Sequence, residues 1–323
     1  MQRIMIATLT VVAVSAALLC VQVSPAAAQD YPVRPITMIV PYPAGGGVDV
    51  MGRLIGQKLS VALGQQVVIE NRGGAGGMIG TRDAARAAPD GYTIVMLLTG
   101  ISLGVDPGYD VNKDFAPIGI VASTPIIVDS NPALQAKSLS DIIALAKKTP
   151  GKLAAGTPPA PTLNYFAAEL FNLMAGTDIT VVTYKGTGPL TNDLLGNHVS
   201  LGFNTIPASV SNIAAGQLRG IAVAAPMRSA ALPDVPTAGE SGLPGFEAIQ
   251  YYGLAAPAGT PRPIVDRINK ELRAILTSDE MKKRFIADGS DPAPSTPQEY
   301  GDNIKREEGK WAALVAKLGL KLE

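Results

Sequence analysis

Apolar, β-branched segments alternate along this chain with segments whose apolar residues recur at helical spacing. The first β-rich run, 36–40, is followed by a helical pattern from Met51 to Ala62. Further β-rich runs at 66–70 and 93–98 flank a second helical segment. Strands that are apolar on both faces and connected by helices predict a parallel sheet covered by helices on both sides.

The alternation is repeated between two long β-rich segments, 118–128 and 247–257. We expect, between and after them, helices starting at Ser138 and over 162–175, 189–195, 207–215, 261–276, 279–287 and 296–318, and strands over 179–185, 199–205 and 218–225. Two strand–helix blocks joined by two long extended segments predict two doubly wound α/β lobes with two crossover strands. Ligands of open α/β sheets bind at the carboxyl ends of the strands, which places the site in a cleft between the lobes.

The N-terminal segment has the organisation of an export signal. Arg3 precedes an apolar run over 4–23, and small residues follow up to Ala28. This pattern predicts a signal peptide over residues 1–28, cleaved after Ala28, and a periplasmic protein. An uncleaved membrane anchor is the alternative; a lipid anchor on Cys20 is disfavoured by Leu19, where a lipobox needs a small residue. The domain division that we expect is lobe 1 over 29–122 plus 253–323 and lobe 2 over 123–252.

Composition and charge exclude several classes of function. The chain has 27 Lys and Arg against 27 Asp and Glu. It therefore lacks the excess of basic residues that would indicate nucleic-acid binding. Its one histidine is His198, and the predicted mature chain has no cysteine, which argues against a metal site built from these ligands. We therefore expect no metal. We also expect no cofactor, no enzymatic activity and a monomer.

The segment PYPAGGGVD, residues 41–49, connects the first predicted strand to the first predicted helix. Its three glycines let backbone N–H groups turn toward a ligand, and the following helix adds its N-terminal N–H groups and the positive end of its dipole. Together these features favour an anion. Asp49 can cap the helix or hold an ordered water. The alternative interpretation is an ordinary flexible turn.

Several segments in one order extend this interpretation to nearly the whole chain: PYPAGGGVD, VVIENRGGAGGMIG, AAPDGYT, KDFAPIGIVA, YKGTGPLTNDLLG, LPDVPTAGESGLPGF and GLAAPAGTP. From about residue 31 to 319 the chain resembles the substrate-binding proteins of tripartite tricarboxylate transporters, the Bug family. The resemblance implies a type II periplasmic-binding-protein fold and a small carboxylate held largely by backbone N–H groups and waters. It also implies delivery of that ligand to the large and small integral membrane subunits of the transporter.

The resemblance places ligand contacts in both lobes. In the first lobe they are Tyr42, Ala44, Gly45, Gly46, Gly47, Asp49, Thr99 and Gly100. In the second lobe they are Gly156, Thr157, Asn164, Tyr184, Lys185, Gly186 and Asn204; the family often has Phe-Asp where this chain has Phe203-Asn204.

Two departures from the family pattern bear on specificity. The stretch from Gly100 to Tyr109 is shorter than in the family, and the second-lobe loop over 156–164 contains three prolines where the family has glycine, serine and, near Asn164, histidine. Proline has no N–H to donate. These departures predict a reshaped second-lobe half of the pocket, whose ligand can differ from the simple dicarboxylates.

Three rival interpretations compete with this one. GISLG at 100–104 matches the nucleophile elbow of a serine hydrolase, with Ser102 as nucleophile and His198 as base, but no helical segment follows it. His198 is better explained as a surface residue of a turn. A dinucleotide site at 73–80 lacks the required glycine spacing, which favours a tight turn with close helix–strand packing. The third rival keeps the fold but presents the ligand to a sensor or receptor.

Three further aromatic residues are not assigned as ligand contacts. Tyr251 and Tyr252, on the second crossover segment, can line the cleft or belong to the core, since neighbouring strand residues face opposite sides. Trp311 lies at helical spacing with Leu314 and Val315 and is predicted to be core.

Overall fold

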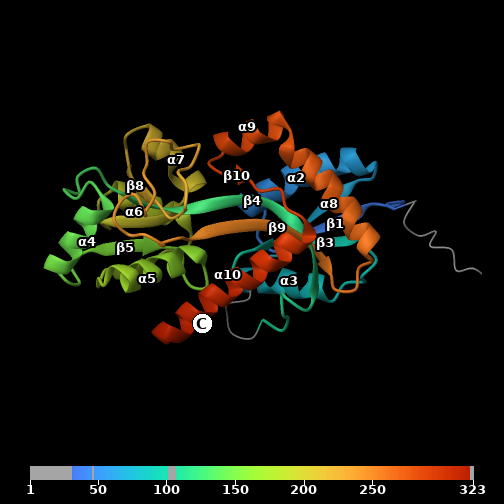
Figure 1. Ribbon diagram of the computed structural model, residues 1–323, viewed down its shortest axis with the longest axis horizontal. Helices are drawn as coiled ribbons and strands as arrows, with labels where there is room; N and C mark the ends of the chain where they lie inside the picture. Colours follow the sequence, from blue (N-terminus) through green and yellow to red (C-terminus); the bar gives the residue numbers. More distant parts are fainter. Residues whose placement is uncertain (1–30, 46, 101–106, 321–323) are drawn as a thin grey trace, which may run out of the picture.

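A computed structural model describes residues 31–45, 47–100 and 107–320 of the chain. The predicted signal peptide, the cleavage position, Gly46 and Ser102 lie outside the described residues. The described elements form two lobes along the long axis of the molecule, with two strands running between them (Figure 1).

The first lobe is built on three parallel strands with helices on both faces. Its strands are β1 (Ile36–Val40), β2 (Val67–Asn71) and β3 (Thr93–Leu98), and β1 is central. One apolar cluster joins the sheet to helices α2 (Gly47–Leu63), α8 (Arg262–Thr277) and α9 (Asp279–Ala287). A second cluster covers the opposite face with α3 (Met78–Ala85), which follows the short 3₁₀ helix η2 (Ala75–Gly77).

The second lobe repeats this plan. Its parallel strands are β5 (Ala154–Thr157), β6 (Thr180–Thr183) and β7 (Leu201–Thr205), and β8 (Arg219–Val223) pairs with the crossover strand β4. Helices α4 (Leu139–Lys148) and α5 (Leu163–Ala175) pack in its largest apolar cluster. Helices α6 (Thr187–Leu195) and α7 (Ile206–Ala214) contribute to two smaller clusters.

Two antiparallel strands connect the lobes. β4 (Phe115–Ser130) pairs with β9 (Ile249–Pro257) through its first part and with β7 and β8 through its last part. β9 pairs with β3 of the first lobe, and the two-residue strand β10 (Asp291–Pro292) pairs with β4. The strand order is therefore β2-β1-β3-β9-β4-β7-β5-β6, in which the crossover strands stand at the centre.

Helix α10 (Pro297–Leu318) is a third connection between the lobes, which the sequence did not suggest. Near its start, Tyr300 is buried against Gly253 of β9; a β-carbon on Gly253 would lie 2.1 Å from the Tyr300 ring. Near its end, Trp311 is fully buried and stacks on Phe166 of α5, with ring centroids 6.0 Å apart. Figure 1 shows α10 running from the first lobe to beneath α5.

The predicted two-lobe α/β fold with two crossover strands is confirmed, and most element boundaries agree within three residues. The N-cap of α4 is Ser138, as predicted, and it forms a capping box with Asp141. Strand β5 was missed, so Gly156 and Thr157 lie at the end of a strand and not in a loop, as the sequence had suggested. Trp311 and Leu314 belong to the second-lobe core, although the predicted division assigns residues 253–323 to lobe 1. The lobe boundaries at 122 and 252 stay a prediction.

Candidate functional site

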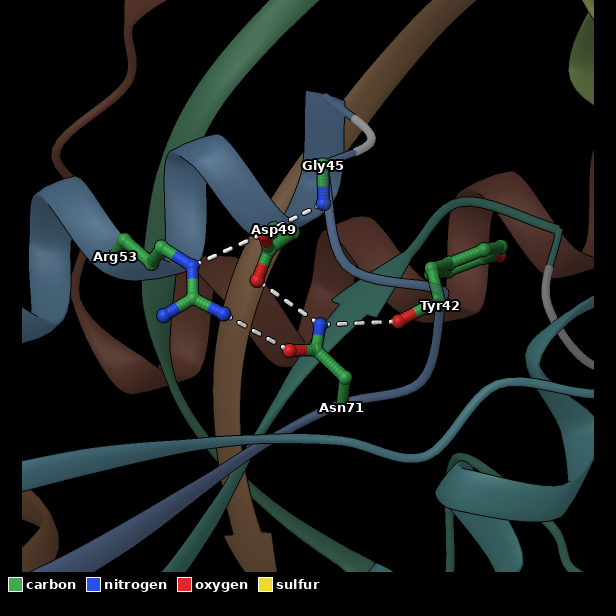
Figure 2. Close-up of polar contacts among 5 residues, drawn as sticks. All are labelled: Tyr42, Gly45, Asp49, Arg53 and Asn71. Atoms are coloured by element: carbon green, nitrogen blue, oxygen red, sulfur yellow. Dashed lines mark hydrogen bonds and ion pairs between the residues drawn. The ribbon is translucent and has the colours of Figure 1, made fainter.

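The loop between β1 and α2 is organised by the carboxylate of Asp49, the third residue of α2 (Figure 2). One carboxylate oxygen accepts hydrogen bonds from the Gly45 N–H at 2.8 Å and from Arg53 Nε at 3.0 Å. The other accepts from Asn71 Nδ2 at 2.9 Å, and the same amide group also donates to the Tyr42 carbonyl at 3.1 Å. Asp49 therefore holds the loop against the end of β2.

This network neutralises a negative charge that would otherwise oppose an anion. Asp49 is only 3% exposed. The hydrogen bond from Arg53, followed by those from Gly45 and Asn71, outweighs its burial and lowers its pKa from 3.8 to about 2. Since the carboxylate is paired with a guanidinium, the start of α2 keeps its exposed N–H groups and the positive end of its dipole without a net negative neighbour.

The Gly-rich turn at 73–77 packs against the same loop. A β-carbon on Gly73 would lie 3.0–3.1 Å from Pro43, and one on Gly80 would lie 2.3 Å from the Arg72 carbonyl. This confirms the interpretation of 73–80 as a tight turn with close helix–strand packing. Ile79 stays 46% exposed beside Gly74.

Thr99 and Tyr42 are held by elements of the first lobe. The Thr99 N–H donates to the Tyr251 carbonyl at 3.2 Å, and the Tyr251 N–H donates to Thr99 Oγ1 at 2.9 Å. Thr99 and Tyr251 also line a cavity of about 20 Å³ under α10, which has room for one water. The ring of Tyr42 points away from the Asp49 network (Figure 2) and packs with Tyr109; burial raises its pKa well above the ordinary value.

Tyr251 and Tyr252 have different surroundings, although they are neighbours on β9. Tyr251 lies at the cavity under α10 and is bonded to Thr99, whereas Tyr252 packs against the main core of the first lobe. Gly100, a buried residue with a φ of 79°, is the last described residue before the gap at 101–106.

In the second lobe, Gly156, Thr157 and Tyr184 lie together. The Tyr184 N–H donates to the Thr157 carbonyl at 2.8 Å. A β-carbon on Gly156 would lie 2.1 Å from the Leu190 side chain and 3.1 Å from the Tyr184 ring, so a larger residue here would displace Leu190. The Tyr184 hydroxyl donates to Asp193 at 2.9 Å, and Gly186 begins α6 without a side-chain cap. Lys185 is exposed.

Asn164 and Asn204 are buried and engaged with other protein groups. Asn164 Nδ2 donates to the Phe203 carbonyl at 2.8 Å. Asn204 Nδ2 donates to both oxygens of Asp129 at 3.2 Å, and the Ser209 hydroxyl donates to the same carboxylate. Burial raises the pKa of Asp129 to about 7, although these hydrogen bonds oppose the shift.

The fold brings the predicted residues together within each lobe. Among the described residues, no hydrogen bond or ion pair joins the first-lobe set to the second-lobe set. Sequence reasoning missed the partners that position the set, Arg53, Asn71 and Asp129. Asn71 and Asp129 lie on strands 22 and 75 residues from the side chains that they contact, whereas Arg53, at i+4 from Asp49 on the same helix, carried a local signal that was not used. The role of the full set in ligand binding stays a prediction.

His198 does not resemble a catalytic base. It lies on the turn after α6, its side chain is 73% exposed, and its nearest acid is Asp193, with Nδ1 3.4 Å from Oδ1. The prediction of a surface histidine is confirmed. Within the described part of the chain, no three His, Cys, Asp or Glu side chains are grouped to hold a metal ion, and no helix has the length and apolar character to cross a membrane.

Known proteins resemble this chain in both sequence and structure. The family described as "Tripartite tricarboxylate transporter family receptor" matches residues 51–320. Protein BugT of Bordetella pertussis is 38% identical over 93% of this chain and 94% of its own. The structure of R. palustris Rpa4515 with adipate is 33% identical with a TM-score of 0.80, over 90% of this chain and 99% of that one. MatC from Rhodopseudomonas palustris with bound malate is 31% identical with a TM-score of 0.76, over 88% and 100%.

Proposed function

The chain belongs to the tripartite tricarboxylate transporter family of receptors, and from this we propose that it captures a small organic carboxylate and passes it to a transporter. Binding involves no covalent step, because a receptor has only to hold and release its ligand. The relatives whose structures contain adipate and malate are similar to this chain over about nine-tenths of its length, which supports a carboxylate as the ligand here.

The observation that carries the proposal is the neutralised loop at the start of α2. The Asp49 carboxylate is paired with Arg53 and Asn71, so the loop 41–45 is fixed while the first N–H groups of α2 stay without intrahelical acceptors. A carboxylate placed there accepts these hydrogen bonds and interacts favourably with the helix dipole. In the second lobe, α6 also begins without a side-chain cap, at Gly186, and this loop contacts the remote part of the ligand.

Capture proceeds by closure of the two lobes on the ligand. A ligand that contacts both lobes stabilises the closed arrangement and shifts the population toward it. β4 and β9 carry the hinge, and α10 limits its range because this helix packs on both lobes. We propose that the ligand contacts are those predicted from the sequence. Among them, Thr99 is hydrogen-bonded to Tyr251 of β9, and Asn204 lies opposite Ile127 of β4, so these two adjoin the hinge strands.

Export and partners complete the proposal. The leader is removed after Ala28, so N-terminal sequencing of the exported protein begins at Gln29. The receptor acts as a monomer and delivers its ligand to the large and small membrane subunits of the transporter. A mature protein that begins at a lipid-modified Cys20 would contradict this scheme.

The test is direct binding of carboxylates by the purified mature protein. Calorimetric titration with a panel that includes malate and adipate should yield at least one saturable ligand. At 100 times its Kd this ligand should raise the free energy of unfolding by about 2.7 kcal/mol. Failure of every acid in the panel to bind or to shift the melting temperature would refute the proposed function.

A matched pair of variants on α2 locates the site. A β-carbon on Gly47 meets nothing within 4 Å, so Gly47→Asp fits the fold while it adds a negative charge at the start of the helix. We expect a loss of affinity of at least about tenfold, equivalent to about 1.4 kcal/mol. Gln57→Asp, an exposed position on the same helix, should leave affinity unchanged. Equal affinities in both variants would move the site elsewhere.

A further inference from the structure

The second-lobe half of the site differs chemically from the first. Resting on the proposed function, we infer that the ligand carries a single carboxylate, bound in the first lobe, and that its remote part, which faces the second lobe, is uncharged and mainly apolar. The receptor is therefore selective for monocarboxylates over dicarboxylates of the same length.

Backbone donors are scarce where β5 leads into α5. Pro158, Pro159 and Pro161 have no N–H, so Ala160 is the one residue between Thr157 and Thr162 that can donate. At the carboxyl end of a parallel strand, this connection is where an α/β lobe ordinarily meets its ligand. In this chain it presents proline rings, and Pro159 is exposed.

Two side-chain donors of this half, Asn164 and Tyr184, are already used, whereas the buried Thr157 hydroxyl has no partner in the described structure. Asn164 donates to the Phe203 carbonyl, and Tyr184 donates to Asp193. Asn204 donates to Asp129, while its own Oδ1 is a buried acceptor without a partner in the described structure. A second carboxylate needs donors, and an unpartnered acceptor opposes it.

The charges beside the start of α6 point the same way. Its one lysine, Lys185, is exposed, and the acids nearby are Asp193, which accepts from the Tyr184 hydroxyl, and Asp129, buried behind the end of β7. The Gly186 N–H already donates to the Tyr184 carbonyl and Pro189 has none, which leaves two N–H groups at the start of the helix. This half therefore offers no excess of positive charge to a second carboxylate.

Two apolar side chains near the anion-binding loop of the first lobe are exposed. Val50, in the first turn of α2, is 50% exposed, and Ile79, beside the Gly-rich turn, is 46% exposed. Together with the prolines they offer an apolar surface that a hydrocarbon or aromatic group can bury on closure.

The experiment compares acids that differ only in the second carboxylate: butyrate with succinate, hexanoate with adipate, and benzoate with terephthalate, by calorimetric titration of the mature protein. We expect the monoacid of the best-binding pair to bind at least about tenfold more tightly than its diacid. A diacid that binds as tightly as its monoacid or more tightly overturns this inference and leaves the proposed function standing. If no acid of either kind binds, the proposed function itself fails.

Two variants assign the cause of the preference. Pro159→Ser restores an N–H and a hydroxyl at an exposed position and should reduce the preference for the monoacid, whereas Pro233→Ser, an exposed proline elsewhere in the second lobe, should not. A preference that is unchanged in Pro159→Ser, or that Pro233→Ser reduces equally, contradicts the inference.

Discussion

Replacing Asp49 with alanine tests whether the anion loop is built by its carboxylate. The substitution removes the hydrogen bonds from Gly45 at 2.8 Å and Asn71 at 2.9 Å and the ion pair with Arg53. A hydrogen bond to a charged group contributes about 1.5–3 kcal/mol, whereas an ion pair with a half-exposed arginine contributes less than about 1 kcal/mol. Water can replace part of what is lost, so we expect Asp49→Ala to lower the free energy of unfolding by about 3 kcal/mol.

Asp49→Asn is the matched control because it keeps the shape and one acceptor oxygen. We expect it to cost about 1 kcal/mol, since it loses the charge but can still accept from one of the two neutral donors. Chemical denaturation followed by circular dichroism measures both variants, and titration with a bound carboxylate gives their Kd. Both variants should bind more weakly, because the loop that presents the α2 N–H groups is released.

The pH dependence follows from the lowered pKa of Asp49, about 2 against an ordinary 3.8. Because the folded-state pKa lies below the unfolded one, the stabilisation is complete above about pH 4 and is lost as the pH falls toward 2. The stability difference between wild type and Asp49→Asn should therefore narrow over that range. Asp49→Ala with unchanged stability would refute the network, and lowered stability with unchanged Kd would reduce Asp49 to a structural role.

Three further predictions concern the scaffold. Gly253→Ala, on β9, should destabilise the protein by about 2 kcal/mol or more, because the new methyl would overlap the Tyr300 ring of α10. Gly309→Ala, at an open position on α10, should be neutral or stabilising by up to about 1 kcal/mol in the same denaturation assay. Burial raises the pKa of Asp129 to about 7, so the melting temperature of wild type relative to Asp129→Asn should fall as the pH rises from about 4 to 7; parallel profiles would contradict this. Trp311→Ala should lower the free energy of unfolding by about 3–5 kcal/mol. In the wild type, Trp311 is the chain's only tryptophan, so its fluorescence emission should change when ligand alters the packing of α10 on the second lobe.

The sequence predicted those features whose physical cause is local. The capping box at Ser138 and Asp141, the fully apolar strand over 93–98 and the helix over 279–287 each carry their signal within a few residues, and the structure has them at the predicted positions. The turn after β1 was likewise recognisable, because only glycine permits a φ of 85° at Gly45 without strain.

Strand β5 shows where local signals end. Its sequence, Ala-Ala-Gly-Thr, has no large β-branched or aromatic residue except the final threonine, so nothing in it predicts a strand. The strand forms because its parallel neighbours β6 and β7 supply the hydrogen bonds, and the missing side chain of Gly156 lets Leu190 of α6 pack directly on the strand. The small side chains of β5 therefore have two effects. They make the strand unrecognisable from its sequence, and they bring α6, with Lys185 and Gly186 at its start, close to the sheet.

Long-range pairing also explains why the network around Asp49 was only half predicted. The position of Asp49 near the start of a helix suggested a cap, but Asn71 is 22 residues away and reaches it only because β1 and β2 are parallel neighbours, with Val40 opposite Asn71. Arg53, one helical turn further, completes the neutralisation. The loop glycines set the backbone conformation of the loop, and the register of β1 and β2 places Asn71 where it can pair with the Asp49 carboxylate. An anion site needs both features. Only the first can be predicted from the sequence of the loop itself.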